Sequence, residues 1–250
     1  MHYWICVDDT DMPGTRGTGW LLQELCRTLE DRQMGACSAI SRHQLFVHED
    51  VPYTSHNSSM CFEFEPARGT TEAQIIDFMG TALETRSQKG SDPGLCVTGP
   101  VTAKAGERLM AFGRTAKQNI CKKGEAYGLA RYLGIHLSGH GGTGDGIIGA
   151  LAGIGLRMSG NDGRYRGWHH LGKPGDVLGV GTLCAYPFID GLVMESGSPL
   201  APEEKVQVGS EKTKTVRLGS RRVVVVTDNE SAKETGIPYR TITKKEAKQY

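Results

Sequence analysis

The chain has 250 residues, 38% of them hydrophobic, which is enough for a buried core in one large domain or two small ones. Glycine accounts for 34 residues, about twice its usual share of ~7%, yet the chain has no collagen-like repeat. The 29 basic residues nearly balance the 28 acidic ones, so the net charge of +1 points to neither a nucleic acid nor a membrane surface.

The N-terminal sequence and the cysteines favour a cytoplasmic protein. Asp8 and Asp9 interrupt the first apolar run and no basic segment precedes it, so we do not expect a signal peptide. The longest nearly apolar stretch, 147–156, is too short to cross a bilayer. The seven cysteines are scattered and form no C-x-x-C pair, which argues against a zinc ribbon and fits a reducing compartment.

The first part of the chain alternates strand-like and helix-like patterns. Apolar spacing predicts strands at 3–7, 60–64 and 95–98, and helices at 21–29, 71–83, 115–133 and 147–158. Thr18 is the expected N-cap of the first helix, and Thr70 or Thr71 that of the second.

The sequence pattern changes beyond residue 172. Short β-type segments separated by Gly, Pro and Ser follow, and 222–227 is the most strand-like run in the chain. We therefore expect an α/β (α+β) protein with a body at 1–171 and a small β-rich module at 172–250.

Three carboxylates, Asp8, Asp9 and Asp11, directly follow the first predicted strand, and a glycine-rich turn at 14–19 comes next. Ligand sites of α/β sheets lie at the carboxyl ends of strands. Crowded carboxylates attract a divalent cation, and Mg²⁺ typically takes one or two carboxylates plus substrate phosphates. The helix start behind them offers N–H groups to a phosphate. The alternative interpretation is an acidic turn with a helix cap.

A second glycine-rich segment runs directly into the helix predicted at 147–158. Its candidate binding residues are Gly141, Gly142, Thr143, Gly144, Asp145 and Gly146. A backbone with so few Cβ atoms can wrap a phosphate closely, so the loop predicts phosphate or nucleotide binding. It is not a Walker A loop, because no Gly-Lys-Ser/Thr ends it. A flexible linker is the alternative.

Gly149, Gly153 and Gly155 lie inside that helix, where each costs about 1 kcal/mol relative to alanine. Such a penalty predicts close packing against another backbone. His136 and His140 have the spacing of a metal pair, but no third ligand is evident. The absence of G-x-S-x-G disfavours a serine hydrolase.

Basic residues offer weaker candidates for acceptor binding. Arg164 and Arg166 suit a polyanion, because guanidinium binds phosphate bidentately. Lys117, with Lys122 and Lys123, forms a basic cluster that is more typical of a solvated helix face than of a phosphate contact.

Four ordered motifs across residues 1–160 resemble those of a known family. They are Val7-Asp8-Asp9-Thr10-Asp11, Val51-Pro52-Tyr53-Thr54 with Asn57, Asp92-Pro93-Gly94, and Ile147-Ile148-Gly149-Ala150-Leu151-Ala152. They are similar to I-D-D-T-D, I-P-Y-K-T-R-G-N, N-P-G and L-I-G-A-L-A of the archaeal 2-agmatinylcytidine synthetases, which modify an isoleucine tRNA.

This resemblance implies a mixed-sheet, kinase-like body with a ferredoxin-like segment at about 60–125. It also implies an enzyme that activates a cytidine with ATP and then displaces the phosphate with an amine. Asp8, Asp9 and Asp11 would hold Mg²⁺, the glycine loop 141–146 the nucleotide phosphates, and Thr18 would receive phosphate. The family's C-T-T is Gly17-Thr18-Gly19 here, so a helix cap is the alternative role of Thr18.

The resemblance does not extend to the family's OB-fold and zinc ribbon, which hold tRNA. The leading expectation is an ATP- and Mg²⁺-dependent ligase or phosphotransferase whose acceptor is an RNA, such as a tRNA cytidine, with a small amine as co-substrate. An ATP-dependent enzyme of a small metabolite is one alternative. A non-catalytic nucleotide- or RNA-binding regulatory module is the other.

Overall fold

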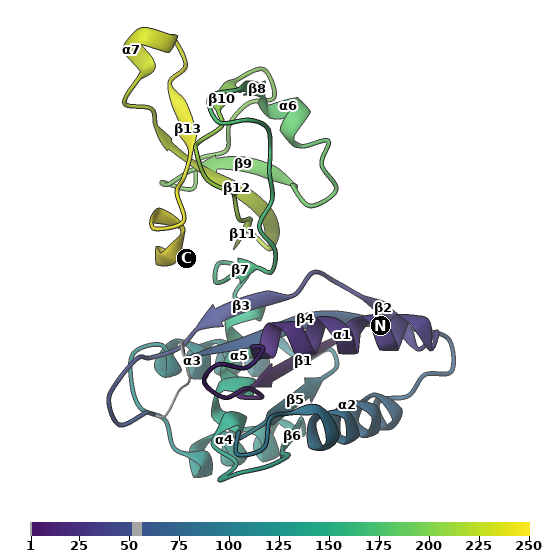
Figure 1. Cartoon of the computed structure of the whole chain (residues 1–250). Coiled ribbons are helices and arrows are strands. Elements are labelled where there is room, and N and C mark those ends of the chain that lie inside the picture. Colours follow the sequence, from purple (N-terminus) through teal and green to yellow (C-terminus); the bar gives the residue numbers. More distant parts are fainter. Residues whose placement is uncertain (1, 52–56) are drawn as a thin grey trace. The chain divides into compact units, whose positions relative to one another are not determined.

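The computed structural model describes residues 2–51 and 57–250 and has the mixed α/β fold that the sequence predicts. The chain divides into two compact units, Met1–Ser159 and Gly160–Tyr250 (Figure 1). This division falls earlier than the expected one after residue 171. Strand β7 (Arg164–Tyr165) pairs with β11 (Val216–Leu218) inside the second unit, which explains the difference.

The first unit is one antiparallel sheet with helices on both faces. Its elements are β1 (Tyr3–Asp8), α1 (Thr18–Asp31), β2 (Gly35–Cys37), β3 (Ser41–Gln44), β4 (Ser58–Pro66), α2 (Glu72–Arg86), β5 (Gly94–Thr98), α3 (Ala103–Ala116), α4 (Lys123–Leu133), β6 (His136–Gly139) and α5 (Gly146–Met158). The strand order is β6-β5-β1-β4-β3, and β2 also pairs with β4. In this register Cys6 of β1 lies between Cys61 of β4 and Cys96 of β5.

A ferredoxin-like β-α-β-β-α-β arrangement is present, but it does not lie at 60–125. It consists of β1, α1, β2, β4, α2 and β5, in the strand order β5-β1-β4-β2, and spans residues 3–98. The expected segment contains only β4, α2, β5 and α3. The position of β1 between β4 and β5 is a long-range pairing that local sequence patterns do not reveal.

The alternation of side chains along β1 separates two cores. Tyr3, Ile5 and Val7 pack with α1 and α2 on one face of the sheet. Cys6 packs with residues of α3, α4 and α5 on the other face. Asp8 follows the same period of two and therefore lies on the α5 side.

The glycines of α5 allow the close packing that the sequence predicts. A Cβ at Gly155 would overlap the backbone carbonyl of Leu109 in α3. At Gly153 it would overlap the side chains of Cys6 and Ser59, and at Gly149 the carboxyl group of Asp8. Helix α5 therefore lies against both α3 and the sheet, and this spacing leaves room for the Asp8 side chain.

The single helix predicted at 115–133 is wrong, because the chain breaks at 117–122 between α3 and α4. The Thr102 hydroxyl accepts the Ala105 N–H (3.3 Å) and caps α3. The Glu125 carboxylate accepts the Lys122 N–H (2.8 Å) and fixes the start of α4. The cap of α2 at Thr71 is confirmed, with Gln74 completing a capping box.

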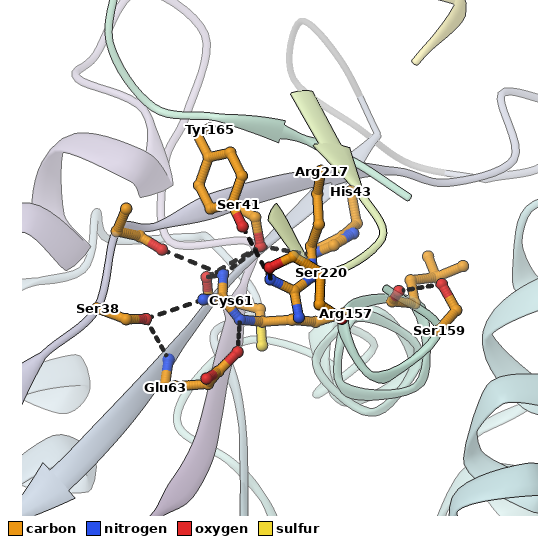
Figure 2. A network of polar contacts seen from close by, with 12 residues as sticks. Ser38, Ser41, His43, Cys61, Glu63, Arg157, Ser159, Tyr165, Arg217 and Ser220 are labelled. Carbon is orange, nitrogen blue, oxygen red and sulfur yellow. Dashed lines mark hydrogen bonds and ion pairs between the residues drawn. The ribbon is translucent and has the colours of Figure 1, made fainter. Parts of the chain in front are cut away.

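A buried arginine joins the C-terminal end of α5 to the sheet (Figure 2). Arg157 is only 1% exposed. Its guanidinium donates to the Glu63 carboxylate (3.1 Å), the Cys61 carbonyl (2.9 Å), the Ser41 hydroxyl (2.6 Å) and the Ser38 hydroxyl (2.8 Å). Since Ser38 and Ser41 flank the bend between β2 and β3, one side chain holds both this bend and β4 against α5.

The second unit is a small β-rich body. Its elements are β7, β8 (Val177–Gly179), α6 (Val180–Leu183), β9 (Gly191–Met194), β10 (Lys205–Gln207), β11, β12 (Arg221–Asp228), α7 (Ala232–Thr235), β13 (Tyr239–Thr241) and the 3₁₀ turn η1 (Glu246–Gln249). Strand β12 is central, because Val224 and Val226 enter one core while Val223 and Val225 enter another.

All seven cysteines are free thiols. Among the helices that the structure describes, none combines the length and apolar character needed to span a bilayer.

Alanine at two glycine positions tests the packing of α5. Gly155→Ala should destabilise the protein by about 1–3 kcal/mol, because its methyl group meets backbone that cannot yield. Gly128→Ala lies in α4 with open space around it and should stabilise by about 0.5–1 kcal/mol. Urea unfolding measures both changes, and a Gly155→Ala variant as stable as the wild type would contradict the packing.

Candidate functional site

A cavity of about 370 Å³ opens at the carboxyl end of β1. Its polar lining includes Asp8, Asp9, Asp11, Thr18, Asp50, Asn57, Asn119, Lys122, Lys123, Asp145 and Gly146. The structure thus brings the predicted acids and Thr18 together with the last two residues of the glycine loop. The volume falls within the roughly 300–1,000 Å³ that is usual for small-molecule sites.

Asp8 is the most enclosed of the acids. Its side chain lies in the space left by Gly149, and the residue is 8% exposed. Burial, reinforced by the negative charge of Asp9, raises the pKa of Asp8 to about 8. The Asp9 N–H donates to the Asp8 carboxyl group (2.9 Å), which only partly compensates for the lost solvent.

Asp9 adopts a left-handed backbone conformation, with φ of 52°, as the chain leaves β1. This conformation is uncommon outside glycine, although Asp and Asn adopt it more readily than other residues. Burial, followed by the charge of Asp92, raises the pKa of Asp9 to about 6. The carboxylates at this end of the sheet are therefore close enough to repel one another.

Asp11 holds the start of α1. One of its oxygens accepts both the Thr18 N–H (3.1 Å) and the Thr18 hydroxyl (2.9 Å). The Thr18 oxygen in turn accepts from the backbone N–H and the hydroxyl of Thr10, each at 3.2 Å. The structural N-cap is Gly17, so the expectation that Thr18 caps the helix is wrong. Thr18 is instead the first helical residue, with its hydroxyl directed at a carboxylate.

Asp92 occupies the glycine loop. Its carboxylate accepts the Gly144 N–H (2.9 Å) and the Thr143 hydroxyl (3.1 Å). A side chain at Gly142 would overlap the same carboxylate. Gly141, Gly142, Thr143 and Gly144 do not line the cavity, whereas Asp145 and Gly146 do. The bare backbone of the loop thus wraps an anion of the protein itself.

Lys122 and Lys123 stand in the same cavity as the acids. Lys123 donates to the Thr143 carbonyl (2.7 Å) and pairs with Asp145 (3.1 Å), so it joins the start of α4 to the glycine loop. These two lysines belong to the basic cluster that the sequence favours as a solvated face. The break between α3 and α4, which sequence patterns missed, brings them here.

The apolar wall of the cavity comes from Leu45, Phe46 and Ile120, which lie in loops without a periodic pattern that sequence reasoning could use. Asn57 donates to the Phe46 carbonyl (2.7 Å) and shapes this wall. Residues 52–54 of the predicted motif lie outside the described residues.

The arginines assigned to acceptor binding do not lie in the unit that holds the cavity. Arg164 is 9% exposed and donates to the Ala247 carbonyl (3.3 Å), so it is a structural residue of the second unit rather than an accessible polyanion contact. Arg166 is exposed. Lys117 ends α3 and does not line the cavity.

The donor set suits a hard cation. Among the described residues, five aspartates and two lysines line the cavity, and carboxylate oxygens are ligands that Mg²⁺ accepts. No three His, Cys, Asp or Glu side chains within residues 2–51 and 57–250 stand close enough to form a complete metal site. A cation held by one or two of these carboxylates would therefore need further oxygen ligands from a bound substrate.

Fold and site together define an α/β protein with a ferredoxin-like sheet and an acidic cavity of small-molecule size at the end of its first strand. No protein-family model matches the chain, and no curated protein matches it. Solved structures do match. A complex of TiaS with a tRNA and ATP aligns with a TM-score of 0.53 and 22% identity, over 62% of this chain and 36% of that one.

Two further structures agree. A tRNA fluorescent labeling enzyme aligns with a TM-score of 0.52 and 22% identity, over 62% of this chain and 36% of its own. Apo TiaS, a tRNA agmatidine synthetase, aligns with a TM-score of 0.50 and 20% identity, over 62% of this chain and 35% of its own. The chain thus spans about a third of these proteins, and the resemblance seen in the motifs is confirmed as a shared fold.

Burial of Asp8 predicts that the stability of the protein depends on pH in the opposite direction from that produced by a salt-bridged aspartate. Because the folded pKa of Asp8 is about 8 and the ordinary value is 3.8, the folded state binds the proton more tightly. Stability should therefore fall as pH rises between about 4 and 8. Melting temperatures across this range should drop more for the wild type than for Asp8→Asn. Parallel curves for the two proteins would contradict the assignment.

Proposed function

We propose that this protein is an ATP-dependent enzyme that activates an acceptor by phosphoryl transfer, with a tRNA cytidine as the leading acceptor and a small amine as co-substrate. The observation that supports it best is that the three predicted acids, Thr18, two lysines and the start of α5 line one cavity. The shared fold with TiaS, of which complexes with ATP and with agmatine are known, supports the same proposal.

The charges of the cavity determine how it binds ATP. A triphosphate enters a site with an excess of aspartates, so its charge has to be neutralised. Lys122 and Lys123 provide part of this, and the N-terminus of α5 adds its positive dipole end. Asp8, Asp9 or Asp11 would hold Mg²⁺, and the bound ion would supply neutralisation of the negative charge that develops during transfer.

Thr18 and Asp11 have the geometry of a nucleophile and its base. The Thr18 hydroxyl donates to Asp11 at 2.9 Å, within the usual range for such a pair. Attack of the Thr18 oxygen on the γ-phosphorus would form the new P–O bond, pass the hydroxyl proton to Asp11 and release ADP. The phosphate would then be available to the acceptor.

Phosphoryl transfer chemistry needs positioning and charge neutralisation more than covalent groups. The apolar wall of Leu45, Phe46 and Ile120 is suited to one face of a nucleobase, and the amide of Asn119 offers hydrogen bonds to the base. The acids and lysines suit the phosphates and the metal, so the lining of the cavity divides by chemistry into a base-binding part and a phosphate-binding part.

ATP consumption tests the proposal. Purified protein with Mg²⁺ and γ-labelled ATP should release phosphate or ADP in the presence of bulk tRNA and agmatine. Asp8→Asn and Asp11→Asn should each lower the rate by at least about 10²-fold, the scale on which electrostatic contributions to catalysis are lost. Asp77→Asn, an exposed acid of α2, is the matched control and should retain the wild-type rate.

Three outcomes separate the alternatives. Turnover that requires a small acceptor instead of tRNA would identify an enzyme of metabolites. Nucleotide binding that survives Asp8→Asn without any turnover would identify a regulatory module. If no ATP is consumed with any of these acceptors, the proposal of an ATP-dependent enzyme is wrong.

The fate of the label tests Thr18 separately. If Thr18 receives the phosphate, the protein itself should acquire label that Thr18→Ala abolishes and Thr18→Ser retains. Thr15→Ala is the control, because Thr15 lies in the same turn but its hydroxyl donates to the Met12 carbonyl (2.8 Å). Unchanged turnover in Thr18→Ala would restrict Thr18 to holding Asp11 and Thr10 in place.

A further inference from the structure

A chain of four polar side chains crosses from β6 to α2, outside the cavity. His136 and Ser138 lie on the same face of β6, because side chains alternate along a strand, and His140 follows directly after the strand ends at Gly139. The Ser138 oxygen lies 2.8 Å from His136 Nε2 and 2.7 Å from His140 Nε2. The other ring nitrogen of His140, Nδ1, lies 3.1 Å from the Glu84 carboxylate of α2.

The contacts are compatible with one set of hydrogen-bond directions that activates Ser138. In a neutral His140 that donates from Nδ1–H to the Glu84 carboxylate, Nε2 offers a lone pair. Ser138 then donates its hydroxyl proton to His140 and accepts from the Nε2–H of His136. Burial lowers the pKa of His136, which fits a neutral ring in this place.

A glycine on α2 makes room for the imidazole. A Cβ at Gly80 would lie 2.8 Å from His140 Cε1, inside contact distance. Glycine in the middle of a helix costs about 1 kcal/mol relative to alanine, and at this position it allows the ring of His140 to approach α2 closely. The orientation of His140 is therefore fixed from two sides, by Gly80 and by Glu84.

From these contacts we propose that Ser138, His140 and Glu84 form an activated serine that reacts with small acyl esters. A nucleophile within hydrogen-bond reach of a base, with the base oriented by a third group, is the arrangement that such chemistry requires. Ser138 and His140 are the catalytic pair, and Glu84 is a positioning residue that acts through His140. The serine lies on a strand, which is why no G-x-S-x-G motif marks it.

The strand edge supplies the remaining element, a donor for the oxyanion. Strand β6 ends the sheet, and the His140 N–H donates to the Pro93 carbonyl (2.8 Å) in the segment leading into β5. Because N–H groups alternate between the two edges of an antiparallel strand, the N–H of Gly139 points away from β5. This group belongs to the residue directly after the nucleophile, where it can stabilise developing negative charge.

The reaction balances with water as the only other reactant. The Ser138 oxygen bonds to the acyl carbon while its proton passes to His140 Nε2, and the alcohol leaves with that proton. Water then attacks the acyl-serine, gives its proton to His140, and releases the carboxylic acid with the Ser138 hydroxyl restored.

The experiment uses an alkyl fluorophosphonate, which phosphonylates activated serines with loss of fluoride, and p-nitrophenyl acetate as the ester. Intact mass and peptide mapping should place one label per chain on Ser138, and Ser138→Ala should abolish it. Ser159→Ala is the matched control, since Ser159 is also partly buried but its hydroxyl donates to the Leu156 carbonyl (2.6 Å). Its labelling rate should equal that of the wild type.

The base and the positioning residue have separate readouts. His140→Gln should slow labelling and ester turnover by about 10²-fold or more, the usual contribution of a general base. Glu84→Gln should lower both rates, and Glu84→Asp should restore most of the loss, which a merely structural role would not produce. The Glu84 side chain is 63% exposed, so we expect both variants to fold, and circular dichroism checks this.

Three results would overturn the proposal. An unlabelled protein, under conditions that label trypsin completely, would show that Ser138 is not activated. A Ser138 label that forms at the same rate in His140→Gln would show that His140 does not act as the base. Ester turnover that EDTA abolishes and Zn²⁺ restores would assign the two histidines to a metal. ATP consumption plays no part in these readouts, so the proposal stands or falls independently of the proposed function.

Discussion

Helix α5 can lie against the sheet only because glycine occupies the positions where it meets β1, β4 and α3. Gly149 leaves space for the Asp8 carboxyl group, and Gly155 admits the carbonyl of Leu109. Arg157 holds the opposite end of the same helix through its buried guanidinium (Figure 2). The position of the candidate site therefore follows from the spacing between α5 and the sheet. The glycines of α5 allow this spacing, and the hydrogen bonds of Arg157 hold it near the C-terminal end of the helix.

The electrostatics of the cavity follow from this spacing. Close packing removes water from Asp8, and the sharp turn at Asp9 keeps a second carboxylate beside it. The carboxylate of Asp92 accepts the Gly144 N–H and the Thr143 hydroxyl, and so uses donors of the glycine loop itself. A phosphate would therefore have to reach the lysines and the start of α5, or displace Asp92, and in either case a cation lowers the cost of bringing anions together.

The sequence predicts features that depend on neighbouring residues and misses those that depend on distant ones. The acids after β1, the apolar α5 and the packing role of its glycines are local signals, and the structure confirms the strand, the helix and the close contacts. The part played by Asp92 in a loop that lies about fifty residues along the chain, at Gly144, has no local signature. The break at 117–122 contains no glycine or proline, so local sequence patterns do not mark it.

The three cysteines in register across β4, β1 and β5 can report when α5 separates from the sheet. Cys6, Cys61 and Cys96 are each 0% exposed beneath α5, beside the unpaired hydroxyl of Ser59. A thiol reagent can reach them only when α5 lifts from the sheet, so their alkylation rate measures the free energy of that local opening. Since Cys6 precedes Asp8 by one period of the strand, any ligand that ties α5 to the end of β1 would also slow the modification of these thiols.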